Sequence, residues 1–142
     1  MRAFDTNVLV YATVVSSPQH AIALRVLTGS AESRRPWAIA WPSVYEFLRV
    51  VTHPRVLHPP MPMAAATGVI RTLCASPSLV LISETPRHAE VMTELLEASG
   101  ATGNLVHDAH IAALCLEHGV TELVTADRDF SRFPQLKIHN PF

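Results

Sequence analysis

Five acidic residues carry the chemistry that this sequence most readily predicts, because four of them lie at or just after the ends of predicted strands and the fifth lies in the opening turns of a predicted helix. They are Asp5, Glu46, Asp108, Asp127 and Asp129. Carboxylate oxygens are the ligands that Mg²⁺ and Mn²⁺ prefer, and clustered carboxylates repel one another unless a cation lies among them. The acids therefore predict a divalent-cation site. A cation held there would orient a water molecule and stabilise charge on a leaving oxygen, which is hydrolytic chemistry.

Asp108 is the most informative of the five, because helical periodicity puts it on an apolar face. Its neighbours on that face would be Leu105, Ala112, Cys115 and Leu116. A carboxylate among such residues must be paired, hydrogen-bonded or bound to a metal, since burying it alone is costly. The alternative is that Asp108 stabilises its own helix N-terminus, an explanation that applies more readily to solvent-facing acids.

His107 and His110 flank Asp108 in a pattern that looks like a metal-binding one. The same periodicity turns both histidines away from Asp108, toward the face of Glu117 and His118. We therefore expect them to lie on a solvated face. Elsewhere the histidines form no zinc-binding spacing.

The other acids each have a structural explanation beside the functional one. Glu46 stands three residues after Ser43, which is the spacing of a capping box, and on its own this explanation is as strong as metal binding. Asp5 could initiate a turn, although it leads straight into the apolar segment 8–11. One of Asp127 and Asp129 is expected to be a loop or cap residue, and Asp127, nearer the strand, is the predicted ligand.

Short apolar or β-branched runs alternate with longer helical patterns, which predicts an α/β fold with a parallel sheet of four to five strands flanked by helices. The predicted strands are residues 2–5, 37–41, 79–83, 122–125 and 136–139, the last at an edge. The predicted helices are residues 18–28 (ended by Gly29), 42 or 43 to 53, 63–75, 85–99 and 104–118, with loops at 53–62 and 127–134. Ligands of such sheets bind outside the carboxyl ends of the strands, where the acids collect.

Composition limits the classes of protein to be considered. The 142 residues are 49% apolar and 16% charged, as expected for one domain over residues 1–142 and not for a disordered chain. No apolar run approaches the roughly 20 residues of a membrane-spanning helix, so we expect a cytoplasmic protein. Cys74 and Cys115 both lie in apolar helical stretches and are predicted to be core residues.

The charge distribution is compatible with a nucleic-acid partner in spite of a net charge of −1. When the five clustered acids are set aside, 7 acids face 11 basic residues, ten of which are arginine. A basic surface around an acidic centre would suit phosphate binding, and an arginine-rich genome would explain the same bias. The expected phosphate contacts are some of Arg34, Arg35, Arg49, Arg55, Arg128 and Arg132.

Four segments, in this order along the chain, resemble the motifs of PIN-domain ribonucleases, in particular the VapC toxins of bacterial toxin–antitoxin pairs. They are residues 5–12, 46–51, 104–113 and 125–130. The resemblance implies a Mg²⁺-dependent endoribonuclease, with Mn²⁺ as an alternative ion, acting on tRNA or ribosomal RNA. It also implies a homodimer inhibited by a VapB-type antitoxin. By matching position it makes metal-binding acids of Asp5, Glu46, Asp108 and Asp127, supported by Thr6 and Asn7, with Asp129 as an additional acid.

Two other classes of function compete with the nuclease. An apolar strand ending in Asp-x-Asn also resembles haloacid-dehalogenase-type phosphatases and phospho-acceptor receiver domains, but both need a lysine near the phosphate, and the only lysine here is Lys137, beyond the last acidic motif. A PIN-like module that binds RNA or protein without cutting is the third class, and retention of all the acids argues against it. Surplus apolar surface on the helices at 18–28 and 42–52 would serve the antitoxin or the homodimer.

Overall fold

Five parallel strands form a single sheet in the computed structural model, which describes residues 1–142, and their order is β3-β2-β1-β4-β5. The strands are β1 (Arg2–Phe4), β2 (Trp37–Ala40), β3 (Leu79–Ile82), β4 (Glu122–Val124) and β5 (Lys137–His139). The α/β class, the parallel sheet and the position of the last strand at an edge are thereby confirmed. Because all strands run in one direction, their carboxyl ends meet at one edge of the sheet.

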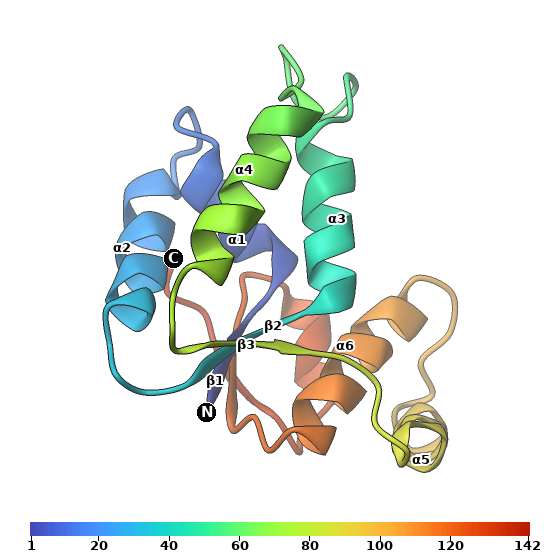
Figure 1. The fold of residues 1–142 in the computed structure, drawn as a ribbon. Coiled ribbons are helices and arrows are strands. Elements are labelled where there is room, and N and C mark those ends of the chain that lie inside the picture. Colours follow the sequence, from blue (N-terminus) through green and yellow to red (C-terminus); the bar gives the residue numbers. More distant parts are fainter.

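Helices cover both faces of this sheet (Figure 1). They are α1 (Thr6–Thr13), α2 (His20–Ala31), α3 (Trp41–Val51), α4 (Met63–Cys74), α5 (His88–Ser99) and α6 (Leu105–Glu117), together with the 3₁₀ helix η1 (Arg128–Arg132). Figure 1 shows α1 to α4 above the sheet, and α6 with α5 on the other side.

Alternation along the strands sends side chains to two separate cores. In β1, Phe4 joins Trp37 and the apolar residues of α1 to α4 on one face. Ala3, the preceding residue, joins α6, η1 and Leu95 of α5 on the other face. The buried residues of the central strands β1, β2 and β4 are therefore all apolar, as expected for a parallel sheet covered on both faces, whereas polar residues begin β1, β4 and β5.

The segment after β1 differs from the prediction. Residues 6–13 form α1, a helix that the sequence pattern does not reveal because its apolar residues show little helical periodicity. Asp5 is the N-cap of this helix, and its Oδ1 accepts from the backbone N–H of Thr6. The turn-initiating role considered for Asp5 is thus real, and it coexists with the position at the end of a strand.

Three further predictions, at Pro18, Gly29 and Cys74, are wrong. Pro18 does not open α2, which begins at His20, and Gly29 lies inside that helix and does not end it. Cys74 is exposed at the end of α4, whereas Cys115 is buried as predicted. The remaining helices and strands lie where the sequence places them, with ends displaced by up to three residues. None of the helices has both the length and the apolarity that crossing a membrane requires.

We expect opposite effects on stability from alanine at two glycines. Neither site has an atom within 4 Å of the added Cβ, so sterics do not intervene. Gly29 is helical, and Gly29→Ala should stabilise the protein by about 0.5 kcal/mol. Gly100 ends α5 with a φ of +61°, so Gly100→Ala should destabilise it by about 1 kcal/mol. Chemical denaturation of both variants measures this, and a destabilising Gly29→Ala would contradict the helical assignment.

Candidate functional site

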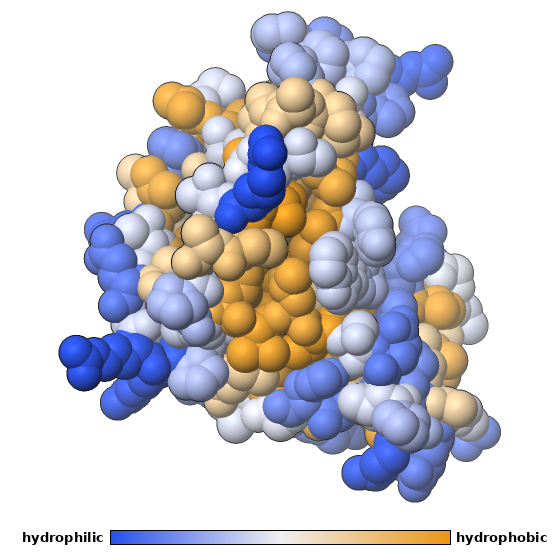
Figure 2. All heavy atoms as spheres, viewed as in Figure 1, coloured by the Kyte–Doolittle hydropathy of each residue, from blue (hydrophilic) through white to orange (hydrophobic).

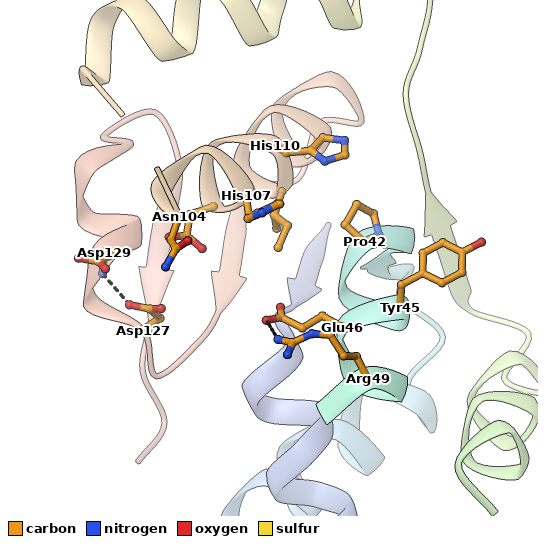
Figure 3. Close-up of a pocket in the computed structure, with 11 residues that line it drawn as sticks. Pro42, Tyr45, Glu46, Arg49, Asn104, His107, His110, Asp127 and Asp129 are labelled. Atoms are coloured by element: carbon orange, nitrogen blue, oxygen red, sulfur yellow. Dashed lines mark hydrogen bonds and ion pairs between the residues drawn. The ribbon is translucent and has the colours of Figure 1, made fainter. Parts of the chain in front are cut away.

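An open cleft of about 610 Å³ lies at the carboxyl edge of the sheet, between the start of α3, the start of α6 and η1 (Figure 3). Its lining is mostly polar and comprises Pro42, Tyr45, Glu46, Arg49, Asn104, His107, Asp108, His110, Ile111, Asp127 and Asp129. Four of the five predicted acids therefore line one cleft. Asp5 is only 4% exposed and is not among the lining residues.

Asp5 is the most completely hydrogen-bonded of the acids. Its Oδ1 accepts from the backbone N–H of Thr6 at 2.7 Å, and its Oδ2 accepts from Asn7 Nδ2 at 2.6 Å and from Thr125 Oγ1 at 2.7 Å. The supporting role expected of Thr6 and Asn7 around Asp5 agrees with these contacts. Asn7 also contacts the segment after β4, because its Oδ1 accepts from the backbone N–H of Ala126.

Thr125 is a residue of the site that the sequence reasoning missed. It is fully buried, and its hydroxyl donates to Asp5 while accepting from Asn7 Nδ2 and from the backbone N–H of Asp127, both at 2.9 Å. The strand register carries the signal that would have found it. Phe4 pairs with Val124, so the residues that follow them, Asp5 and Thr125, come out side by side at the same edge.

Asp108, Asp127 and Asp129 come together on the side of the cleft formed by α6 and the start of η1. One carboxylate oxygen from each lies within 4.8 Å of the others. Asp127 Oδ1 accepts from the backbone N–H of Asp129, so Asp127 also caps η1, and its other oxygen accepts no hydrogen bond from the protein. The cap role expected of one of the two acids thus falls on Asp127, which is the acid chosen from the sequence as a ligand.

Glu46 does not cap α3, and the capping-box explanation is wrong. The helix begins at Trp41, so Ser43 lies inside it as a buried residue. Glu46 points instead toward the cleft, where its Oε2 accepts from Thr6 Oγ1 at 2.9 Å and its Oε1 lies 3.4 Å from an Arg49 guanidinium nitrogen. The contact with Thr6 joins Glu46 to the start of α1, next to Asp5.

Burial, together with electrostatic repulsion, raises the pKa of two carboxyl groups in this arrangement. Burial raises the pKa of Asp5 to about 6, and the charges of Glu46 and Asp108 add to this, against the hydrogen bonds from Thr125 and Thr6. Burial, then Asp127, Asp129 and Glu46, raise the pKa of Asp108 to about 6 as well. Neither carboxylate forms an ion pair with an arginine or a lysine.

The histidines of α6 are closer to the acids than predicted. His107 and His110 line the same cleft as Asp108, and the charge of His107 acts to lower the pKa of that carboxyl. More than one face of α6 borders the open cleft at the start of the helix. His107, His110 and Asp108 therefore line the same cleft although they lie on different faces of α6.

The predicted arginines divide between opposite edges of the sheet. Arg49 lines the cleft, whereas Arg35 precedes β2 and lines a different cavity, with Arg2 and Arg25, at the amino ends of the strands. Arg35 therefore does not flank the acids, contrary to the expectation. The error arises because a residue before a parallel strand and one after it are at opposite edges.

No thiolate lines the cleft, and besides the imidazoles of His107 and His110 its charged donors are carboxylate oxygens. Such ligands fit hard cations such as Mg²⁺ and Mn²⁺. The raised pKa values of Asp5 and Asp108 fit the same conclusion, since a cation would stabilise the ionised carboxylates that burial and mutual repulsion disfavour. Asp108, Asp127 and Asp129 are the acids whose oxygens lie close enough together to share an ion.

We expect metal-free Asp108→Asn to be more stable than the wild type at neutral pH. The pKa of Asp108 is raised from 3.8 to about 6 in the folded state, so wild-type stability falls as pH rises through that window. Asparagine removes the penalty, on the order of 1 kcal/mol, or a Tm a few degrees higher at pH about 7.5, and the gain should vanish near pH 4. Thermal melts in EDTA measure this. Glu94→Gln, at an exposed position of α5, is the control, and a pH-independent difference would contradict the assignment.

Comparison with known proteins identifies the family. The family model for the PIN domain matches residues 3–136. Ribonuclease VapC37 of Mycobacterium tuberculosis is 36% identical over 141 residues, covering 99% of this chain and 97% of the relative. Ribonuclease VapC48 of the same species is 33% identical over 139 residues, covering 98% and 96%.

Solved structures share the fold. VapBC2 from Rickettsia felis, bound to a DNA fragment from its promoter, superposes with a TM-score of 0.70 at 22% identity, covering 98% of this chain and 97% of that one. Mycobacterium tuberculosis VapC20, described as a Sarcin-Ricin loop cleaving toxin, superposes with a TM-score of 0.67 at 18% identity, covering 92% and 93%. With the family model and the near full-length relatives, the carboxylate cleft identifies this chain as a member of the PIN-domain family, among its VapC ribonucleases.

Proposed function

We propose that this protein is a Mg²⁺-dependent endoribonuclease that acts as the toxin of a VapBC-type pair. The observation that carries the proposal is the convergence of the Asp108, Asp127 and Asp129 oxygens within 4.8 Å at the edge where Asp5 and Glu46 also lie. Mg²⁺, or Mn²⁺ in its place, would be held by Asp108 and Asp127 together with Asp5 and Glu46, and Asp129 would add a further oxygen. Bound there, it would polarise the scissile phosphate and stabilise charge on the leaving oxygen.

The protein's own groups divide the remaining tasks. Asp5, held by three donors, fixes the floor of the site. Glu46 stands across the cleft from Asp127 and Asp129 (Figure 3) and is the carboxylate placed to accept the proton of the attacking water. Attack at phosphorus would break the bond to the 3′ oxygen, leaving a 5′-phosphate and a 3′-hydroxyl that takes its proton from solvent.

The α3 wall of the cleft has the groups needed to hold a nucleic acid. Tyr45 is 66% exposed, and Arg49 lies one turn further along the helix with its side chain 64% exposed. An exposed aromatic ring offers a stacking surface for a base, and the guanidinium offers a phosphate contact. These features support RNA as the substrate, and we propose the cytoplasm as the compartment in which it is met. We propose structured RNA, tRNA or ribosomal RNA, as the target class.

An observation against the phosphatase alternative concerns Lys137. Its ammonium lies 3.1 Å from Glu122 Oε1, and Glu122 is the first residue of β4. The lysine is therefore at the amino end of the strands, opposite the acids, where it does not reach a phosphate in the cleft. The arrangement thus favours a nuclease over a phosphoaspartate enzyme.

Exposed apolar surface supports the proposed protein partners. Leu24 on α2 is 45% exposed, and Trp41 and Tyr45 at the start of α3 are also exposed. We assign the face of α2 around Leu24 to an amphipathic helix of a VapB-type antitoxin. A second apolar area lies around the edge strand β3 and below α4 (Figure 2), where Val80 is 38% exposed, and it is our candidate for the homodimer contact.

A series of carboxylate-to-amide variants tests the nuclease. Asp108→Asn and Asp127→Asn should each lower cleavage of total cellular RNA at least 100-fold, since each removes a charged ligand. Glu46→Gln should lower it without lowering the Tm, because glutamine still accepts from Thr6. EDTA should abolish cleavage by the wild type, and Mg²⁺ should restore it. Activity that survives EDTA would contradict the metal mechanism, and folded wild type that never cleaves would favour a non-cleaving module. Sequencing of the cut ends identifies the target.

The toxin assignment has its own test. Expression of the wild type alone should arrest growth, and co-expression of the small protein encoded beside it should relieve the arrest. Asp108→Asn should be harmless yet co-purify with that partner, because the partner surface is intact. Leu24→Glu should weaken co-purification about 10-fold or more, whereas Val80→Glu should affect self-association only. Harmless wild type that nevertheless cleaves RNA in vitro would remove the toxin role and leave the nuclease.

A further inference from the structure

A second group of metal-ligating side chains lies between the β3–α5 loop and α6, beside the acidic cleft. It consists of Glu84 in the loop, His88 at the start of α5, and His110 on α6, and one ligand atom from each lies within 4.8 Å of the others. His110 Nε2 is 2.8 Å from Glu84 Oε1, and the two imidazole rings meet edge to face with centroids 5.2 Å apart. The two helices involved lie side by side (Figure 1).

A buried carboxylate orients one of the two histidines. The side chain of Glu117 is 1% exposed, and its Oε1 lies 2.5 Å from His88 Nδ1. Its Oε2 accepts from the backbone N–H and the hydroxyl of Thr85. Because Thr85 donates both of its hydrogen bonds to Oε2, Oε1 is left to accept from His88 Nδ1. With Nδ1 directed at Glu117, Nε2 is the His88 nitrogen available to a metal.

We propose that Glu84, His88 and His110 form a zinc site, distinct from the Mg²⁺ cleft, that fastens the start of α5 to α6. Two imidazoles and one carboxylate are ligands that Zn²⁺ accepts in tetrahedral geometry, with water in the fourth position. A histidine whose second nitrogen donates to a carboxylate, as His88 does to Glu117, is the usual arrangement around bound zinc. Mg²⁺ prefers oxygen ligands and would favour the cleft instead.

The geometry needs only a small adjustment. Ligands about 2.1 Å from a tetrahedral zinc ion lie roughly 3.4 Å apart, so groups within 4.8 Å of one another must close by little more than 1 Å. The Glu84 side chain is 51% exposed and lies in a loop, so it is the ligand with freedom to move. The histidine side chains, 22% and 28% exposed, leave an entry path from solvent.

The experiment measures metal binding and not RNA cleavage, so its result does not depend on the nuclease. The parent protein is the Asp108→Asn/Asp127→Asn double variant in excess Mg²⁺, which suppresses binding to the acidic cleft. Titration with Co²⁺, used as a spectroscopic substitute for zinc, should give one equivalent of a site with the intense visible bands of tetrahedral coordination. Zn²⁺ should displace the Co²⁺ and raise the Tm by several degrees.

Three variants locate the site and one serves as a control. His88→Ala should weaken Zn²⁺ binding at least 100-fold, and Glu84→Gln, at an exposed position where misfolding is not expected, at least 10-fold. Glu117→Gln should weaken it about 10- to 100-fold by loosening His88. His58→Ala, at an exposed histidine in the loop after α3, should leave binding unchanged. Absence of the Co²⁺ bands in the parent, or equal Zn²⁺ affinity in the parent and Glu84→Gln, would overturn the proposal and leave these contacts as hydrogen bonds only.

Discussion

A buried carboxylate at the end of the central strand is the constraint around which the site is built. Asp5 follows β1, which lies in the middle of the strand order, and it is held by donors from α1 and from the end of β4. A carboxylate so deeply buried is stable only when its oxygens are satisfied, so the start of α1 and the end of β4 must keep their places. The hydroxyl of Thr125 also accepts from the backbone N–H of Asp127, so it fixes Asp127 relative to Asp5.

The remaining acids make the opposite contribution, because they repel one another and Asp5. Within the cleft only Arg49 offers a permanent positive charge, and it approaches Glu46 at 3.4 Å and not Asp108. The cost falls on the folded protein, as the raised pKa of Asp108 shows. The two apolar cores on either side of the sheet offset that cost. Because the carboxylates are gathered before a metal binds, the empty metal site reduces the stability of the metal-free chain.

Patterns local in sequence predicted most of the fold, and contacts between distant segments account for most of the errors. The strands and most of the helices follow from apolar runs and from stop signals such as Gly100. Helix α1 was missed because it is short and apolar, and the capping box at Ser43 failed because the helix already begins at Trp41. The acids of the cleft were found because strand ends converge in any parallel sheet. The partners of Thr125 and His88 depend on register and helix packing, which one sequence does not show.

Helix α6 links the two groups of ligands. Asp108 and His110 are two residues apart on it, one beside the carboxylates of η1 and the other beside Glu84 and His88. Its buried side chains, among them Ala109, Ala112 and Leu114, pack it against the sheet, so its position is fixed by the core and not by either cluster. The cleft offers carboxylate oxygens at its centre, which suit a hard cation such as Mg²⁺. The other cluster offers imidazole nitrogens, which suit a borderline cation such as Zn²⁺, so the two adjoining clusters would select different ions. One rigid helix can therefore serve two sites, since neither has to move it in order to form.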